Sequence, residues 1–228
     1  MSSLGGPSIV TSGLVLHLDA GNTKSYPGTG TTWYDRSGNL NGGVVNNGTL
    51  VNGPSFSSTN MGSIGFDGVN DYVNTNYTPP VSNFTVSILY KCNAFSAWAG
   101  IWACEVWNSG TGYLTYFNTS TSLVFSKGGV TVASIVADST KLANYTFTLA
   151  SDGTAKIYIN GILQSSTTIV LATSVTNPII LSTRYSNDGT SITDTRASII
   201  PYFSVYNRVL SATEVLQNFN ATRTRFGI

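Results

Sequence analysis

The chain has 228 residues, of which 41% are hydrophobic and only 9% are charged, and its formal net charge at pH 7 is +1. The apolar content is too high for a disordered chain, and the near-neutral balance provides no basic surface for a phosphate backbone, so we expect a single folded domain that does not bind nucleic acid. The start MSSLGGPSIVTSG has no basic segment followed by an apolar one, and no apolar run approaches the length of about 18 residues that a membrane span needs. We therefore expect neither a signal peptide nor insertion into a membrane.

Short apolar or alternating segments follow one another along the chain, bounded by Gly, Asn, Asp, Ser and Pro, and this spacing is typical of antiparallel strands. The predicted strands are 14–18, 63–66, 72–75, 84–90, 100–106, 113–117, 122–126, 130–136, 145–150, 154–159, 162–166, 179–181 and 197–205. The pattern predicts an all-β fold, either an antiparallel sandwich or a barrel.

Turn residues define two hairpins. Asn160-Gly161 allows the two positive φ angles of a type I′ turn, which pairs residues 156–159 with 162–165. Asp152-Gly153 does the same for 145–150 and 154–159. Together these turns predict a three-stranded meander.

One helix is predicted, at the C-terminal end. Ser211 and Glu214 have the spacing of a capping box, and Leu210 and Val215 that of a hydrophobic staple. We expect the helix to run over about residues 212–220, with Leu216 and Phe219 forming its apolar stripe.

The two cysteines, Cys92 and Cys104, do not form a metal-binding pattern. If residues 84–92 and 99–107 form one hairpin, the two sulfur atoms lie too far apart to bond, so we expect two free thiols.

Three stretches together resemble one family: GLVLHLDAGNTKSYPGTGTTWYDRSGN (13–39), GSIGFDGVNDYV (62–73), and DGTAKIYINGIL (152–163) with VYNRVLSATEVLQNFNATRTRFGI (205–228). They are similar to the laminin-G-like branch of the concanavalin A-like lectin/glucanase superfamily. The resemblance implies a two-sheet antiparallel jelly-roll sandwich with one short C-terminal helix, over residues 13–228 after an N-terminal arm of residues 1–12. The opening and closing motifs are similar to those of virion proteins of tailed bacteriophages. Since this superfamily contains enzymes, lectins and structural modules, the fold alone does not define the function.

The stretch FDGVNDYV (66–73) places Asp67, Asn70 and Asp71 around a glycine. Asp and Asn favour tight turns because their side chains bond their own backbone, and a turn is our first interpretation. The same oxygen atoms, with Asp19 or Asp35 as further ligands, could hold calcium, which is the second interpretation. A catalytic carboxylate pair is the last, since the two residues flank a turn at the rim of the sheet.

Three of the four tryptophans, Trp98, Trp102 and Trp107, lie close to Tyr113 in the stretch 94–113, with Glu105 beside them. Sugar rings stack on aromatic faces, so an exposed cluster here would bind carbohydrate. Strand alternation places Trp98 and Trp102 on one face and Glu105 and Trp107 on the other, which predicts that at least one tryptophan is in the core instead.

The remaining chemistry is sparse. His17 is the only histidine, and the sequence indicates no activated serine for which it could act as the base of a catalytic triad. We therefore expect His17 to be a structural residue in a strand. The glucanase branch, by resemblance, carries Glu-x-Asp-x-x-Glu on one strand. No strand here has such alternating carboxylates, and the only glutamates are Glu105 and Glu214. We therefore predict that the protein is not an enzyme.

The leading hypothesis is a structural protein at the surface of a phage virion, either a capsid decoration protein or the head of a fibre. It would contact other virion proteins or sister subunits through the arm and one sheet edge, and could adhere to cell-surface glycans. The alternative hypothesis is a soluble carbohydrate-binding, lectin-like module.

Overall fold

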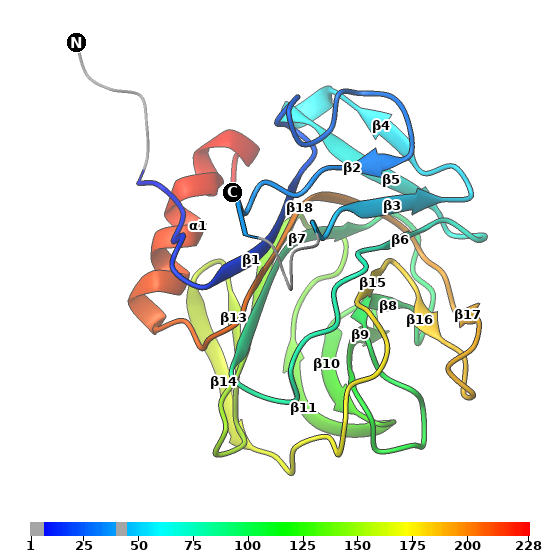
Figure 1. Cartoon of the computed structure of the whole chain (residues 1–228), viewed down its shortest axis with the longest axis vertical. Coiled ribbons are helices and arrows are strands. Elements are labelled where there is room, and N and C mark those ends of the chain that lie inside the picture. Colours follow the sequence, from blue (N-terminus) through cyan, green and yellow to red (C-terminus); the bar gives the residue numbers. More distant parts are fainter. Residues whose placement is uncertain (1–6, 40–44) are drawn as a thin grey trace.

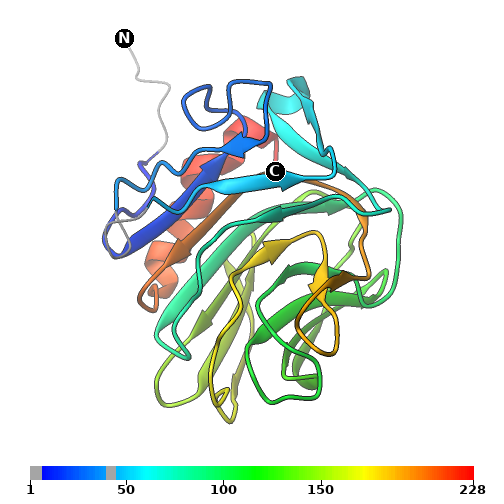
Figure 2. The same cartoon turned by 45° about the vertical axis from the view of Figure 1, so that its right-hand side comes forward.

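A computed structural model describes residues 7–39 and 45–228, and it shows two large antiparallel sheets packed face to face (Figures 1 and 2). The first sheet has the strand order β14 (Ile162–Thr168), β13 (Thr154–Ile159), β12 (Ala143–Leu149), β7 (Phe84–Cys92), β18 (Ala197–Tyr206), β5 (Ser63–Asp67), β4 (Ser55–Ser57), and β1 (Leu14–Asp19) also pairs with β18. The second sheet has the order β11 (Val130–Val136), β10 (Ser122–Lys127), β9 (Tyr113–Thr119), β8 (Gly100–Ala103), β15 (Ile180–Leu181), β6 (Tyr72–Asn74), β3 (Gly48–Val51), β2 (Thr32–Trp33). The hairpin of β16 (Arg184–Tyr185) and β17 (Ile192–Thr193), the 3-10 helix η1 (Thr59–Met61) and the helix α1 (Ala212–Phe226) complete the fold. The predicted all-β jelly-roll sandwich with one C-terminal helix is confirmed.

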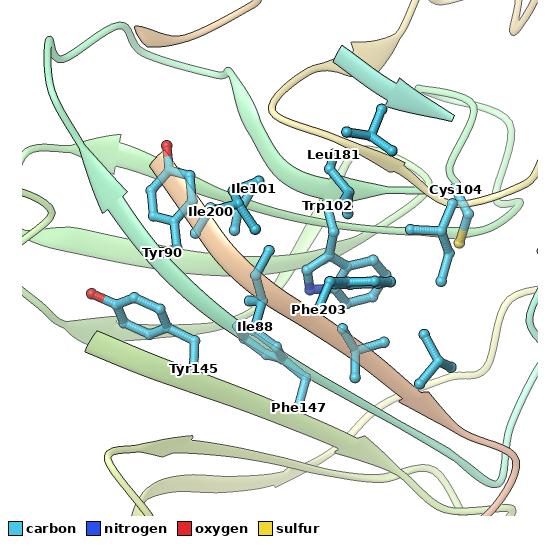
Figure 3. Packing of buried hydrophobic residues seen from close by; sticks show 14 of the residues in the cluster. Ile88, Tyr90, Ile101, Trp102, Cys104, Tyr145, Phe147, Leu181, Ile200 and Phe203 are labelled. Carbon is cyan, nitrogen blue, oxygen red and sulfur yellow. The ribbon is translucent and has the colours of Figure 1, made fainter. Parts of the chain in front are cut away.

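The core lies between the two sheets. Side chains that point inward from β7, β12 and β18 meet those of β8, β9 and β10, as Figure 3 shows around Trp102 and Phe203. The ring centroids of Trp102 and Phe147, which come from opposite sheets, are 5.9 Å apart. Burial of these large aromatic side chains provides much of the driving force for packing the sheets together.

The predicted meander is present as β12, β13 and β14. Asn160 and Gly161 have φ angles of 50° and 78°, and they join Ile159 to its cross-strand partner Ile162. The turn chemistry therefore determined these pairings as the sequence predicts.

The expected hairpin of residues 84–92 with 99–107 is wrong. β7 belongs to the first sheet and β8 to the second, so the segment between them crosses from one sheet to the other. Cys92 and Cys104 are nevertheless both buried and free, as predicted. Local alternation does not distinguish a hairpin from a crossover between sheets, because both join two apolar strands by a short polar segment.

The helix α1 covers the outer face of the first sheet, beside β1 (Figures 1 and 2). The capping box is present, since Ser211 accepts from the Glu214 N–H and Glu214 accepts from the Ser211 N–H. The helix continues to Phe226 and does not end near Asn220, because its last turn packs Phe226 against Tyr202 and pairs Arg225 with Asp19. Leu216, expected in the apolar stripe, is 44% exposed.

Part of the predicted N-terminal arm packs against its own domain. Val10 is buried beside Tyr206 and Val215, and its N–H donates to Asn218 Oδ1 of α1 at 2.7 Å. The carbonyl of Ser8 accepts from Gln217 of the same helix. The structure therefore places residues 7–12 in the domain, whereas the first six residues of the predicted arm lie outside the described part. Within the described ranges, no helix is long and apolar enough to cross a membrane.

Candidate functional site

Two of the four aromatic residues predicted to bind a sugar lie in the core. Trp102 and Tyr113 both have no exposed surface, and Figure 3 shows Trp102 among the buried residues between the sheets. The Tyr113 hydroxyl donates to the Val81 carbonyl at 2.7 Å and accepts from the Ala172 N–H at 3.0 Å. Neither side chain can contact a sugar, so their assignment to the site is corrected.

The other two residues predicted to bind a sugar, Trp98 and Trp107, meet on the outer face of the second sheet. Trp98 is 44% exposed and stacks on Tyr116, with ring centroids 5.5 Å apart and planes 27° apart. Trp107 meets Trp98 edge-on at 5.8 Å. We name Trp98, Trp107 and Tyr116 the aromatic patch. Because Tyr116 covers one side of the Trp98 ring, this tryptophan is held in place while much of it stays accessible.

Strand alternation fails for Trp98 because this residue is not part of a strand. It lies in the turn before β8, with a φ angle of 67°. A bulky side chain rarely adopts this left-handed conformation, and residues held in such a conformation are concentrated at functional sites. The turn brings Trp98 to the same face as Trp107, although the alternation places the two on opposite faces.

The hairpin β16–β17 borders the patch and was not predicted from the sequence. Its Arg184 lies over the Trp107 ring, with Cζ 5.2 Å from the centroid. Arg184 Nε also donates to Asp194 Oδ2 at 2.7 Å. Strands of two residues carry no periodicity, so only the opposite charges of Arg184 and Asp194 in a polar segment could have indicated this pairing.

Glu105 lies beneath the patch and is only 1% exposed. Its Oε2 accepts from Ser126 Oγ at 3.1 Å and from the Gly129 N–H at 3.5 Å, whereas Oε1 has no partner. Burial raises the pKa of Glu105 to about 7, because the charged carboxylate is poorly solvated there. A Cβ on Gly129 would lie 3.1 Å from the Trp107 ring, so the carboxyl group is bonded to the turn that supports this tryptophan.

The stretch from Asp67 to Asp71 forms a turn that leads from β5 in the first sheet to β6 in the second. Asp67 Oδ1 accepts from the Val69 N–H at 2.8 Å, and Asp71 Oδ2 accepts from the Asp67 N–H at 3.1 Å. The Asn70 carbonyl accepts from Asn52. Burial raises the pKa of Asp71. These hydrogen bonds between side chains and the local backbone are typical of a tight turn, which was our first interpretation of this stretch.

Metal binding at this turn stays a prediction. Across residues 7–39 and 45–228, no three His, Cys, Asp or Glu side chains are grouped so that they could hold a metal ion. Asp19, named as a further ligand, is paired with Arg225, and Asp35 accepts from the His17 N–H at 2.8 Å. A calcium ion would therefore depend on Asp67, Asp71 and neutral oxygen atoms.

His17 has a structural environment. Its Nδ1 lies 2.7 Å from Ser204 Oγ on the neighbouring strand, and burial lowers its pKa. It lines a cavity of about 670 Å³ together with Tyr202, Thr222 and Arg225. Part of the rim is formed by Pro7, which directly follows the residues outside the described part.

Comparison with known proteins identifies the family. Residues 67–216 match the laminin-G-like profile of the concanavalin A-like lectin/glucanases superfamily, and the chain belongs to this superfamily. A comparison with curated protein sequences gave no match.

Several solved structures share the fold. A sialidase of Trypanosoma rangeli in complex with the inhibitor DANA superposes with a TM-score of 0.67 at 14% identity, covering 98% of this chain and 36% of that one. A mutant of this sialidase that displays trans-sialidase activity gives 0.68 at 15% identity, covering 98% and 35%. The receptor-binding domain of botulinum neurotoxin type G gives 0.63 at 18% identity, covering 91% and 51%. The chain thus spans about a third to a half of these proteins, and at such identities the likeness shows the fold.

The prediction that the protein is not an enzyme, which we made because one carboxylate pattern is missing from the sequence, is corrected by the comparison with solved structures. Structures that share its fold include sialidases, at 14% and 15% identity and over 36% and 35% of their length. The lack of that pattern therefore excludes no activity.

Proposed function

We propose that the protein is a lectin-like module that binds a carbohydrate at the aromatic patch. The observation that carries this proposal is Trp98, a large aromatic ring that is 44% exposed, stacked on Tyr116 and placed in a left-handed turn. A ring fixed in this way presents a flat apolar surface of the kind on which the C–H face of a pyranose packs.

Polar groups for the sugar hydroxyls lie beside the ring. Arg184 and Asp194 form an ion pair next to Trp107, and their side chains are 15% and 33% exposed. Because the guanidinium and the carboxylate neutralise each other, the surroundings of the patch favour a neutral sugar over an anionic one. The relatives with this fold include a toxin receptor-binding domain, which supports a role in recognition.

Glycan-array binding of the purified protein tests the proposal. We expect a hit for the unmodified protein and its loss in Trp98→Ala, since the stacking surface is removed. Tyr34→Ala is the matched control, because Tyr34 is also an exposed aromatic residue, at 46%, outside the patch. Equal binding by Trp98→Ala and the unmodified protein would show that the sugar site is elsewhere.

We also propose that the module is displayed at a virion surface, where it would contact other virion proteins and cell-surface glycans. The support for this is the likeness of residues 13–39 and 205–228 to virion proteins of tailed phages. Because residues 7–12 pack against α1, the argument for a decoration protein anchored by its arm is weaker, and glycan adhesion is the leading role. Antibody labelling of intact particles, viewed by negative-stain microscopy, tests the location, and unlabelled particles would contradict it.

A further inference from the structure

A buried guanidinium at one end of the sandwich has no counter-charge. Arg196, directly before β18, is 1% exposed. Among residues 7–39 and 45–228, no Asp or Glu oxygen lies within ion-pair distance of it, although Arg184, Arg208 and Arg225 each have such a partner. Arginine stays charged in proteins, so this positive charge remains in the core.

The protein provides the guanidinium with only partial compensation. Nη2 donates to the carbonyl oxygens of Ser96 and Phe117, the latter at 3.1 Å. The rings of Phe95 and Phe117 lie 5.2 and 5.8 Å from Cζ. Nε and Nη1 have no hydrogen-bond partner. A buried charge that lacks hydrogen bonds and a counter-ion is strongly unfavourable, so a further group is expected beside these two nitrogens.

Two more unpartnered groups come from neighbouring elements. The hydroxyl groups of Tyr90 and Ser139 are both fully buried, and neither makes a well-formed hydrogen bond, although that of Tyr90 lies beside Arg196 and Ser198 and that of Ser139 beside the Cys92 thiol. Burial raises the pKa of the Tyr90 hydroxyl to about 12. The positive charge of Arg196 is close enough to oppose part of this rise. Figure 3 shows the Tyr90 hydroxyl at the end of the core away from Trp102. The Ser139 carbonyl accepts from the N–H of Cys92, two residues after Tyr90, which places Ser139 beside the end of β7.

We propose that Arg196, Tyr90 and Ser139 form a buried binding site for a small monovalent anion of the size of chloride. All the unpartnered groups can donate, and one is charged, so a halide satisfies them together while neutralising the guanidinium. A water molecule accepts only about two hydrogen bonds and brings no charge. A single guanidinium does not balance a divalent anion, which excludes sulfate and hydrogen phosphate from the class of ligand.

The structure also provides a way for the ion to enter. Phe95 covers the guanidinium from the side of the solvent, and its side chain is 44% exposed. It lies in the segment between β7 and β8 that crosses from one sheet to the other, outside any strand. An ion would reach the guanidinium if this ring moved, and because Phe95 lies outside the strands, the movement would break no strand pairing.

Thermal unfolding in sodium chloride and in sodium gluconate, at equal ionic strength, tests the site. An ion that binds only the folded state raises the melting temperature in the unmodified protein by about 3–6 °C for each tenfold rise in concentration above its dissociation constant. We expect the chloride-specific rise to be reduced in Tyr90→Phe and absent in Arg196→Met. Thr115→Val is the matched control, because Thr115 also has a buried unpartnered hydroxyl but no hydrogen bond to Arg196, and it should keep the full rise.

Crystals of the unmodified protein grown in sodium bromide give a readout that does not depend on any variant. We expect an anomalous peak within hydrogen-bonding distance of Arg196 Nε or Nη1. The proposal is overturned by equal melting in the two salts, by the same chloride response in Arg196→Met, or by bromide peaks at the surface only with water beside Arg196.

Discussion

At the scale of single residues, burial decides which side chains of an aromatic and acidic segment can act. Trp102 and Trp107 are five positions apart, yet one is enclosed in the core and the other is part of a surface patch. The sequence predicted a tryptophan cluster and its division between two faces, because strand alternation applies to Trp102. It could not predict the position of Trp98, because a residue with a φ angle of 67° departs from the alternation on which the prediction depends.

Glu105→Gln should change how stability depends on pH. The folded-state pKa of Glu105 is raised to about 7 from 4.5, so the folded protein binds this proton more tightly than the unfolded chain. This contribution to stability is fully present below pH 4.5 and is lost as the pH rises through 7. We expect the unmodified protein to lose up to about 3 kcal/mol between pH 4.5 and 8 relative to Glu105→Gln, which cannot ionise.

Urea unfolding of both proteins at pH 5 and pH 8 measures this difference. Parallel behaviour of the two proteins over this range would mean that Glu105 is ionised in the folded state at pH 5, contrary to its burial with an unpartnered Oε1.

Position 98 should invert the usual order of alanine and glycine. Glycine normally costs about 0.5–1 kcal/mol relative to alanine, but at a φ angle of 67° alanine is strained and glycine is not. We expect Trp98→Gly to be at least as stable as Trp98→Ala by thermal unfolding, and both to lose glycan binding. A lower melting temperature for the glycine variant would contradict the left-handed turn.

At the scale of elements, the turns were the most predictable features and the short strands the least. Asn160-Gly161 and the capping box of Ser211 with Glu214 define local geometry through chemistry that is visible in the sequence. The pairings of β15 with β6 and β8 involve two residues each and depend on contacts far apart in the chain. For the same reason the crossover from β7 to β8 was mistaken for a hairpin, since only the assembled sheets distinguish the two.

Gly161→Val should destabilise the protein beyond the strain of the turn itself. A Cβ at Gly161 would lie 2.9 Å from Leu216 Cδ1 and 3.2 Å from Leu216 Cα, so the side chain would collide with α1. We expect a loss of about 2 kcal/mol or more by urea unfolding. Gly30→Val is the matched control. The φ angle of Gly30 is 90°, but no atom lies within 4 Å of a Cβ built there, so this variant should show the backbone strain alone. Equal losses of stability in the two variants would contradict the contact between the hairpin and the helix.

The turn from β5 to β6 provides a test for calcium. A bound ion stabilises the folded state by mass action, so the calcium hypothesis predicts a melting temperature that falls in EDTA and recovers with added calcium. Asp71→Asn should abolish this response, because the substitution removes one of the two carboxylates in the turn. Identical melting temperatures with and without EDTA, and no metal by elemental analysis, would contradict the calcium hypothesis. Asp67, Asn70 and Asp71 would then serve only to form the turn.

At the scale of the whole molecule, the sandwich uses both outer faces. The first sheet is covered by α1 and residues 7–12, whereas the second carries the aromatic patch and the hairpin β16–β17. The packing of residues 7–12 could not be predicted from the sequence, since a short polar segment before the first strand resembles a free arm. Its attachment depends on Asn218. The Oδ1 of this residue accepts from the N–H of Val10, which is 208 residues away in the sequence, and its Nδ2 donates to the Tyr206 hydroxyl.

Deletion of residues 1–12 therefore tests the architecture as well as the role of the arm. The deletion removes the buried Val10 side chain and its hydrogen bond to Asn218, and we expect it to cost about 2–4 kcal/mol of unfolding free energy. Val10→Ala is the matched point variant and should account for a part of this loss, because it removes apolar area and keeps the backbone bond. If the deleted protein is as stable as the full chain, residues 7–12 do not hold α1 in solution. They would then be free to bind a partner, and the virion contact that the sequence predicts for the arm would become the better explanation of its conformation.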